Sequence, residues 1–220
     1  MDRILIVDDH PLFRDALKLS LTQKPSVLAL SDSGQVGFAA SLEEALAILG
    51  DNGNVDLVLL DLHLPGNDGF LGLLELRKAY PTIAVLVISG NDDPSVIGKA
   101  RACGAAGFLS KSMAADSILQ AVKGVLLGEE FWPQGEHSIE VDSELSDIAR
   151  RINQLTDQQL RVLRHLQIGR LNKQVAYDLE ISEATVKAHV TAIFRKLNVL
   201  NRTQAVILAN RLHVDPAVAI

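Results

Sequence analysis

The sequence predicts an α/β domain with a doubly wound parallel five-stranded sheet, followed by a second, smaller all-α domain that contains a helix-turn-helix. Short aliphatic runs alternate with amphipathic stretches over residues 1–128. This alternation favours right-handed crossovers and a parallel sheet with helices on both faces. After residue 150 the pattern is helical only. The balance of charge also changes, from net −5 over residues 1–128 to −6 over 129–150 and +5 over 151–220.

These changes in composition divide the chain into three parts. We expect a first domain at 1–128, a linker at 129–150 and a helix-turn-helix domain at 151–220. A basic segment that follows acidic ones favours two domains with different partners. The positive balance is compatible with a polyanion, although a charge count does not establish nucleic-acid binding.

The expected strands of the first domain are short apolar runs that suit burial on both faces. Four of them are clear in the sequence, at 4–7, 57–60, 83–88 and 108–109. Two runs, 27–30 and 36–39, fit the second strand of the sheet equally well, and the sequence does not choose between them. The helices are expected between the strands, from residue 11 and at 42–49, 71–79, 96–102 and 113–127.

Composition excludes several classes of protein. The start, "MDRILIVDDH", is not that of a signal peptide, and no stretch approaches the ~20 apolar residues of a membrane-spanning helix. The single cysteine, Cys103, excludes an intrachain disulfide and cannot form a zinc site by itself. We therefore expect a cytoplasmic protein without a membrane partner.

Polar residues follow the predicted strands of the first domain. Asp8 and Asp9 follow the first strand, Asp61 ends the third in "VDLVLLDLHLPGNDG", Ser89 ends the fourth and Lys111 follows the fifth. Ligands bind outside the carboxyl ends of parallel strands, so these side chains should lie at one edge of the sheet. Two carboxylates 4 Å apart repel by about 4 kcal/mol, and a hard cation such as Mg²⁺ cancels this cost. The set suits phosphoryl transfer onto a carboxylate.

Each of these residues also has an ordinary structural interpretation. Asp8 and Asp9 could cap a helix that begins at Pro11. Ser89 could be a residue at the end of a strand, and Lys111 could be a solvated lysine. The order and placement of the whole set make chance a poor explanation.

The second domain carries strong signals for helix starts. Thr156 and Gln159 form a predicted capping box. Asn172, Ser182 and Asn201 are predicted N-caps of further helices. The turn between residues 179 and 182 has room only for a tight helix-turn-helix corner.

The helix that follows Ser182 is predicted to be amphipathic. Its inward face consists of apolar residues at helical spacing, namely Val186, Val190, Ile193, Phe194 and Leu197. Its outward face carries small or basic residues, namely Lys187, Ala188, Thr191 and Arg195. By itself this pattern is typical of a plain surface helix, but after a short turn it favours a recognition helix.

The first 128 residues resemble a bacterial response-regulator receiver domain, which has a flavodoxin-like fold. The motifs are "ILIVDDHPLFRDAL", "DLVLLDLHLPGNDG", "VLVISG" and "GAAGFLSK". The resemblance implies that Asp61 is the phosphoacceptor. It implies a Mg²⁺ ion held by Asp9, Asp61 and the backbone carbonyl of His63, with Asp8 acting through water. Ser89 and Lys111 match the positions that bind phosphoryl oxygens, and Ser89 and Phe108 match the switch positions.

Residues 155–209 resemble a LuxR-type helix-turn-helix, so the whole chain is similar to response regulators of the NarL/FixJ class. This resemblance implies contacts with double-stranded DNA from Lys173, Ser182, Thr185, Lys187, Ala188, Thr191, Arg195 and Lys196. It also implies that the last helix, about 203–212, carries a dimer face.

The resulting interpretation is a phosphorylation-controlled transcription regulator, not an enzyme. A sensor histidine kinase would phosphorylate Asp61, and the phosphorylated chain would form a homodimer on DNA. Two alternatives stay open. The first is an aspartate-nucleophile phosphatase. Such an enzyme usually has a second carboxylate two residues after its nucleophile, where this chain has His63, and this difference counts against it. A regulator that does not depend on phosphorylation would use the receiver domain only for dimerisation.

Overall fold

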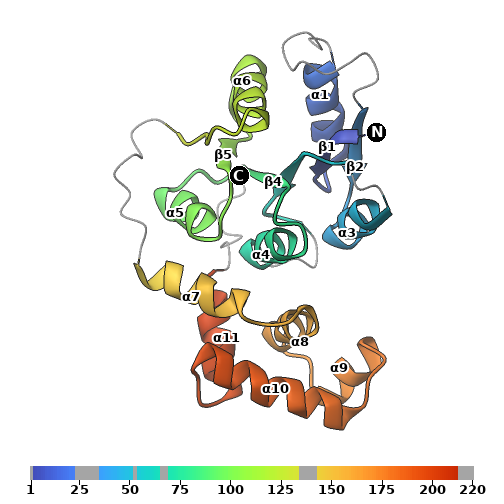
Figure 1. Cartoon of the computed structure of the whole chain (residues 1–220), viewed down its shortest axis with the longest axis vertical. Coiled ribbons are helices and arrows are strands. Elements are labelled where there is room, and N and C mark those ends of the chain that lie inside the picture. Colours follow the sequence, from blue (N-terminus) through green and yellow to red (C-terminus); the bar gives the residue numbers. More distant parts are fainter. Residues whose placement is uncertain (1, 23–34, 52–53, 65–68, 134–142, 213–220) are drawn as a thin grey trace. The chain divides into compact units, whose positions relative to one another are not determined.

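Five parallel strands form one sheet in the order β2-β1-β3-β4-β5 (Figure 1). The structure is a computed structural model that describes residues 2–22, 35–51, 54–64, 69–133 and 143–212. The strands are β1 (Asp2–Val7), β2 (Gln35–Ala39), β3 (Leu57–Asp61), β4 (Ala84–Ser89) and β5 (Gly107–Ser110). The predicted doubly wound parallel sheet is confirmed.

The strand register aligns the carboxyl ends of the central strands. All five residues of β3 are buried, as a strand covered on both faces requires. Val7 is paired with Leu60, Asp61 with Ile88, and Ser89 with Ser110. The ends of β1, β3, β4 and β5 therefore lie along one edge of the sheet.

Helices cover both faces of the sheet (Figure 1). One face carries α1 (Pro11–Thr22) and α6 (Ala115–Leu126), and the other carries α3 (Leu42–Asp51), α4 (Phe70–Ala79) and α5 (Pro94–Ala102). Leu17 and Leu21 of α1 join Leu119 and Val122 of α6 in a core that includes the inward residues of the strands. This packing fixes the strands that carry the polar residues at their ends.

The second strand of the sheet is the later of the two sequence candidates. β2 includes residues 36–39 and pairs in parallel with β1, with Ile6 opposite Phe38. The other candidate run, 27–30, lies outside the residues that the structure describes. The sequence could not decide because both runs are short and apolar.

The remaining helices form a second compact unit. They are α7 (Ser143–Asn153), α8 (Asp157–Gln167), α9 (Asn172–Asp178), α10 (Glu183–Leu197) and α11 (Arg202–Asn210). α10 packs against the other four. α7 occupies the last part of the segment predicted as a linker, so the proposed boundaries between the three parts stay a prediction.

Three of the four predicted N-caps in this unit are confirmed, and one is wrong. The Thr156 hydroxyl accepts from the Gln159 amide, and Ser182 and Asn201 cap α10 and α11 in the same way. Asn172, in contrast, is the first residue of α9, and its N-cap is Leu171. The leucine side chain cannot accept a hydrogen bond, but Gln174 Oε1 accepts from the Leu171 amide at 2.8 Å. A later side chain thus supplies part of the cap.

Candidate functional site

A buried ion-pair cluster lies at the carboxyl edge of the sheet. Lys111 Nζ lies 2.7 Å from Asp61 Oδ2 and 2.8 Å from Asp8 Oδ2. Both aspartate side chains are fully buried, whereas that of Lys111 is 21% exposed. A buried carboxylate needs such a partner because its desolvation is costly. β1, β3 and the segment after β5 therefore meet at these three side chains, as the sequence predicts.

The surroundings of Lys111 keep its ammonium group charged. Burial alone lowers the pKa of Lys111, but the hydrogen bonds that it donates to Asp61 and Asp8, together with their negative charge, outweigh burial and raise the pKa. The Phe13 ring lies below the ammonium, with Nζ 4.8 Å from the ring centroid. This cation–π contact with α1 also favours the charged form.

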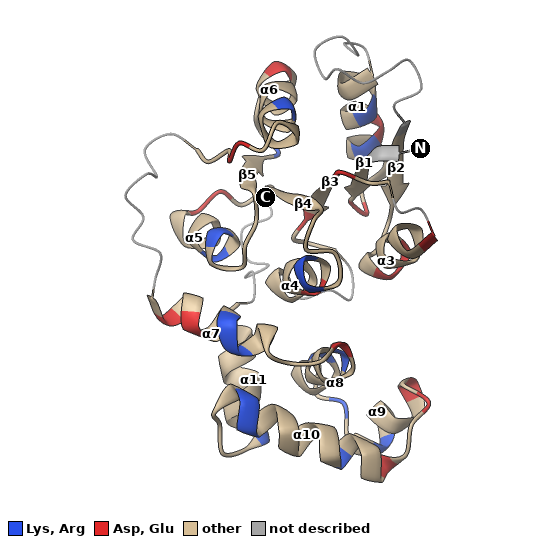
Figure 2. Ribbon diagram, viewed as in Figure 1, with Lys and Arg blue, Asp and Glu red and all other residues tan. Residues whose placement is uncertain are grey.

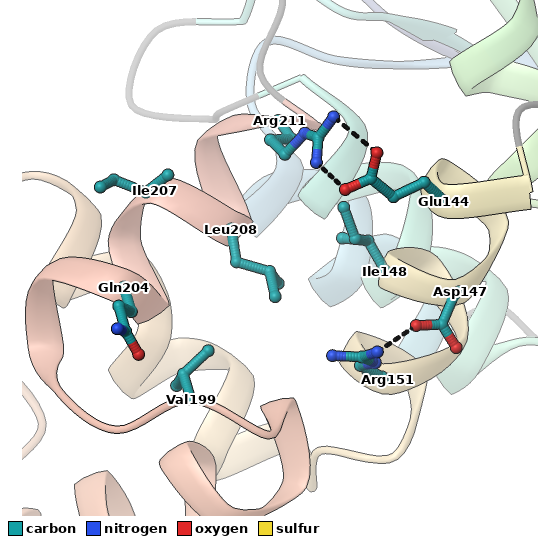
Figure 3. A pocket seen from close by; sticks show the side chains of 9 residues that line it. All are labelled: Glu144, Asp147, Ile148, Arg151, Val199, Gln204, Ile207, Leu208 and Arg211. Atoms are coloured by element: carbon teal, nitrogen blue, oxygen red, sulfur yellow. Dashed lines mark hydrogen bonds and ion pairs between the residues drawn. The ribbon is translucent and has the colours of Figure 1, made fainter.

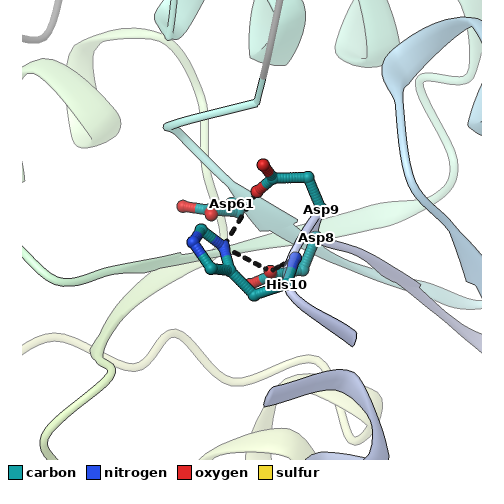
Figure 4. A group of neighbouring side chains, drawn as sticks. All are labelled: Asp8, Asp9, His10 and Asp61. Carbon is teal, nitrogen blue, oxygen red and sulfur yellow. Dashed lines mark hydrogen bonds and ion pairs between the residues drawn. The ribbon is translucent and has the colours of Figure 1, made fainter. Parts of the chain in front are cut away.

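Asp9 and His10 complete the cluster (Figure 4). The His10 amide donates to Asp8 Oδ1 at 2.7 Å, and His10 Nδ1 lies 2.9 Å from Asp9 Oδ1. Oδ1 of Asp9 is buried and receives no well-aligned hydrogen bond within the part of the chain that is described. His10 was not among the predicted site residues, although its position directly after Asp9 was a usable signal.

The donor set of this cluster fits a divalent cation. Asp8, Asp9, His10 and Asp61 each offer one ligand atom, and these atoms lie within 4.8 Å of one another. Carboxylate oxygens are the ligands that hard cations prefer, and the buried Asp9 Oδ1 has unused capacity to accept. The cluster can therefore hold a metal ion.

The other predicted residues of the first unit surround Asp61. The His63 amide donates to Asp61 Oδ1 at 3.1 Å, and His63 Nδ1 lies 3.9 Å from the same oxygen. Ser89 is buried; its Oγ accepts from the Asn91 amide, and its carbonyl accepts from the Lys111 amide at 2.8 Å. Phe108 is fully buried on β5. Ser89 thus lies on β4, the strand next to that of Asp61, and Phe108 lies on β5, one strand further out.

The second unit presents the predicted face of α10. Of the predicted inward stripe, Val186, Ile193 and Leu197 are fully buried, whereas Val190 and Phe194 are half-buried. The exposed residues among the predicted DNA contacts are Lys173, Ser182, Thr185, Lys187, Ala188, Thr191 and Arg195. Figure 2 shows basic residues on both α9 and α10. This exposed set is compatible with a groove of duplex DNA.

Several of these side chains already have partners. Lys196 Nζ donates to the Gln154 carbonyl and to Gln159 Oε1, both at 2.8 Å. Lys187 pairs with Glu183 at 3.1 Å. The Thr191 hydroxyl donates to the Lys187 carbonyl at 3.0 Å, which leaves its methyl group and its oxygen lone pair for a ligand.

A pocket of about 280 Å³ lies between α7 and α11 within the second unit (Figure 3). Ile148 and Leu208 line it, and the ion pairs Glu144–Arg211 and Asp147–Arg151 stand at its rim. Among the helices that the structure describes, none combines the length and the apolar character that crossing a membrane requires.

A parallel sheet with buried aspartates and a lysine at its carboxyl edge, followed by a helix-turn-helix, defines a class: receiver domains joined to DNA-binding domains. Comparison with family models agrees. Residues 4–123 match the response regulator receiver domain, and residues 153–209 match the bacterial regulatory proteins of the luxR family. The chain belongs to the response regulators with a LuxR-type DNA-binding domain, and regulation of transcription under control of phosphorylation is the function of this class.

Curated relatives extend over nearly the whole chain. A glycerol metabolism activator of Pseudomonas putida is 41% identical over 216 residues, which are 95% of each chain. The transcriptional regulatory protein DegU of Brevibacillus brevis is 34% identical, over 93% of this chain and 91% of its own. The nitrate/nitrite response regulator NarL of Escherichia coli is 30% identical over 93% of each. The predicted resemblance to this class is therefore confirmed.

Two solved structures support the fold. A LuxR family DNA-binding response regulator from Silicibacter pomeroyi is 34% identical with a TM-score of 0.51, over 61% of this chain and 98% of its own. The RcsB response regulator of Salmonella typhimurium has a TM-score of 0.51 over 95% of this chain and 98% of its own. At 21% identity, the RcsB likeness concerns the fold alone.

Proposed function

We propose that Asp61 accepts a phosphoryl group from a sensor histidine kinase and that its phosphorylation controls dimerisation and DNA binding. The observation that carries this proposal is the position of Lys111 Nζ, 2.7 Å from Asp61 Oδ2 and 2.8 Å from Asp8 Oδ2. An oxygen of Asp61 attacks the phosphorus of the phosphohistidine. The nitrogen–phosphorus bond breaks, its electron pair stays on the imidazole, and an acyl phosphate forms on Asp61.

The residues around Asp61 have separate roles in this transfer. Asp9, Asp61 and the backbone carbonyl of His63 would hold Mg²⁺, with Asp8 acting through water. When bound, the ion would neutralise charge on the phosphoryl oxygens. Lys111 would exchange its bond to Asp61 for one to a phosphoryl oxygen, because its charged ammonium lies beside the carboxylate of Asp61. The Ser89 hydroxyl donates to another phosphoryl oxygen.

Ser89 and Phe108 form the proposed switch. Ser89 accepts from the Asn91 amide through Oγ, and a phosphoryl group on Asp61 would draw this hydroxyl toward β3. Phe108 lies beside Val87 in the β4–β5 ladder, so a shift at the end of β4 reaches it through backbone pairing. The two residues thereby connect the phosphate to the outer edge of the sheet.

The exposed side chains of α9 and α10 form the proposed DNA interface. Lys187, Ala188 and Thr191 would face base edges, and Lys173, Arg195 and Lys196 would contact phosphates. Ser182 and Thr185 lie at the start of α10, where amide groups approach a phosphate. Lys196 would first have to leave Gln154 and Gln159. A homodimer would place two such helices on two half-sites.

We also propose that the protein does not turn over an external substrate. The position two residues after Asp61 carries His63, whose Nδ1 lies 3.9 Å from Asp61 Oδ1, instead of the carboxylate of an aspartate-nucleophile phosphatase. The groups around Asp61 then support only the transfer of one phosphoryl group onto Asp61 itself.

A DNA-binding measurement tests the proposed control. A pool of random duplexes is bound to wild type and to Asp61→Asn, each with Mg²⁺, with and without acetyl phosphate. We expect the phosphoryl donor to strengthen binding of wild type and to leave the variant unchanged. Salt-dependent binding that is equally strong with and without acetyl phosphate in both proteins would instead support a regulator that does not depend on phosphorylation.

A further inference from the structure

The segment that follows α6 pairs with the outer edge of β5. The Phe131 amide donates to the Ala106 carbonyl at 3.1 Å, and the Phe108 amide donates to the Phe131 carbonyl at 2.8 Å. Gly107 and Phe131 thus form a parallel bridge. An edge strand exposes unpaired backbone groups, and these two hydrogen bonds satisfy a pair of them. We name residues 130–132 the β5 clip.

Gly107 is a residue that this close approach requires. A Cβ atom at position 107 would lie 2.2 Å from the Phe131 carbonyl oxygen and 2.8 Å from Leu86 Cδ1. Atoms do not approach so closely, so any larger residue would push the clip away from β5. Because glycine has no Cβ, the backbones of β5 and the clip can approach each other closely, which no other residue would allow.

Side chains hold the clip on both sides of the bridge. The Phe131 ring packs against the core between the sheet and α6. Trp132 lies under the guanidinium of Arg101 from α5, 4.4 Å from the ring centroid, and its Nε1 donates to Glu130 at 2.7 Å. The clip therefore contacts β5, α5 and the core.

One hydrogen bond connects the clip directly to Phe108, a residue of the proposed switch. The Phe108 amide, which bonds to Phe131, belongs to the strand that leads directly to Lys111. The Lys111 amide in turn donates to the Ser89 carbonyl. A displacement of β5 that accompanies a change at Ser89 must stretch or release the hydrogen bonds of the clip.

We propose that Phe131 and Trp132 are positioning residues that couple the state of Asp61 to the chain that leads to the second unit. The clip holds this chain to β5 in the resting protein, and phosphorylation loosens it. This inference rests on the proposed function, because without phosphorylation of Asp61 there is no signal to couple. It identifies a route along which a conformational change at β5 is transmitted to the chain after residue 133.

Trp132 provides the direct measurement, since it is the only tryptophan of the chain. Its emission is recorded in the full-length protein with Mg²⁺, before and after acetyl phosphate, and the mass of the intact protein is measured in the same samples. We expect the emission to change as the phosphate adduct forms and to stay constant in Asp61→Asn. An adduct without a change in emission would overturn the inference alone. Absence of an adduct with any donor would overturn the proposed function and the inference together.

Two variants open the clip in different ways. Gly107→Ala crowds the Phe131 carbonyl, and Phe131→Pro removes the amide that bonds to Ala106 without adding an atom beside Leu86. Gly50→Ala is the matched control, because its added Cβ would meet only the Tyr80 hydroxyl at 3.8 Å. We expect both clip variants to form the phosphate adduct and to bind DNA without acetyl phosphate. We also expect acetyl phosphate no longer to strengthen their DNA binding or to change the emission of Trp132.

Other outcomes would contradict the coupling role. Clip variants that keep the full donor-dependent gain would show that the signal does not pass through Phe131. Clip variants that fold, by circular dichroism, but form no adduct would show that the clip maintains the phosphorylation site itself. The Gly50→Ala control should behave as wild type in every measurement.

Discussion

The ammonium of Lys111 lies 2.7 Å from Oδ2 of Asp61, and this contact joins the end of β3 to the segment after β5. The two residues are fifty positions apart in the sequence. The lysine is paired with a carboxylate that we propose to be phosphorylated, so its charge is already in place for the phosphoryl oxygens. The same contact also makes the site a determinant of stability.

Replacement of Lys111 by methionine should destabilise the first unit. The change leaves two buried carboxylates, Asp8 and Asp61, without their cation. We expect the free energy of unfolding to fall by about 3 kcal/mol, the lower limit for breaking a buried ion pair, because Lys111 is partly exposed. Urea unfolding without divalent cations measures the loss, and Mg²⁺ should restore part of it.

Lys123→Met is the control for this prediction, because Lys123 is exposed on α6. Its effect should stay within about 0.5 kcal/mol, as is usual at the surface. Equal stability of the Lys111 and Lys123 variants would show that the buried ion pair contributes nothing.

Cys103 should resist alkylation in the folded protein. Burial raises the pKa of its thiol to about 12, against a smaller opposing effect of Lys99. The reactive thiolate is therefore scarce at pH 8. Treatment with iodoacetamide should leave the mass of the native protein unchanged and add one group after unfolding in urea. Rapid labelling of the native protein would contradict the burial of this thiol.

The same pKa shift gives stability a defined dependence on pH. The unfolded thiol loses its proton near pH 9, whereas the folded one keeps it up to about pH 12. This thiol therefore leaves stability unaffected below pH 9 and reduces it as the pH rises toward 12. The free energy of unfolding should fall less between pH 8 and pH 10 in Cys103→Ala than in wild type. Equal losses in both proteins would exclude this contribution.

Arg195→Ala should weaken DNA binding without changing sequence preference. The guanidinium is on the exposed face of α10, where we propose that it contacts a phosphate. Loss of one phosphate contact should reduce the slope of log affinity against log salt by about one. Binding titrations at several salt concentrations measure the slope, and Lys123→Ala in the first unit is the control. An unchanged slope would remove Arg195 from the interface.

Ser182→Ala should destabilise the second unit by about 1 kcal/mol, the usual cost of losing an N-cap. The Ser182 hydroxyl accepts from the Thr185 amide at 3.0 Å, and alanine cannot replace it. Ser182→Asn, which retains an acceptor, should restore most of the stability. Thermal unfolding followed by circular dichroism compares the three proteins. If the alanine and asparagine variants melt together, the cap is not the cause.

The sequence predicts the sheet and the acidic cluster because both depend on strong local signals. Strands buried on both faces must be continuous apolar runs, as 57–60 is, and parallel strands place their ends at one edge. Asp61 and Lys111 were therefore predictable as neighbours. Their assignment as phosphoacceptor and phosphoryl ligand depends on the resemblance and stays a proposal.

Other features depend on contacts that a linear pattern does not show. The pairing of Phe131 with β5 has no sequence signal, because a single bridge needs no apolar run. The inward position of Lys196 depends on acceptors at Gln154 and Gln159, about forty residues earlier. The predicted cap at Asn172 failed because Gln174 serves the preceding amide instead.

The mass of the intact protein after incubation with acetyl phosphate tests the central claim most directly. Wild type, Asp61→Asn and the control Asp15→Asn, whose aspartate is exposed on α1, are each incubated with and without Mg²⁺. We predict one phosphate adduct in wild type and in Asp15→Asn, dependent on Mg²⁺, and none in Asp61→Asn. An adduct that persists in Asp61→Asn would contradict the assignment of Asp61 as the phosphoacceptor.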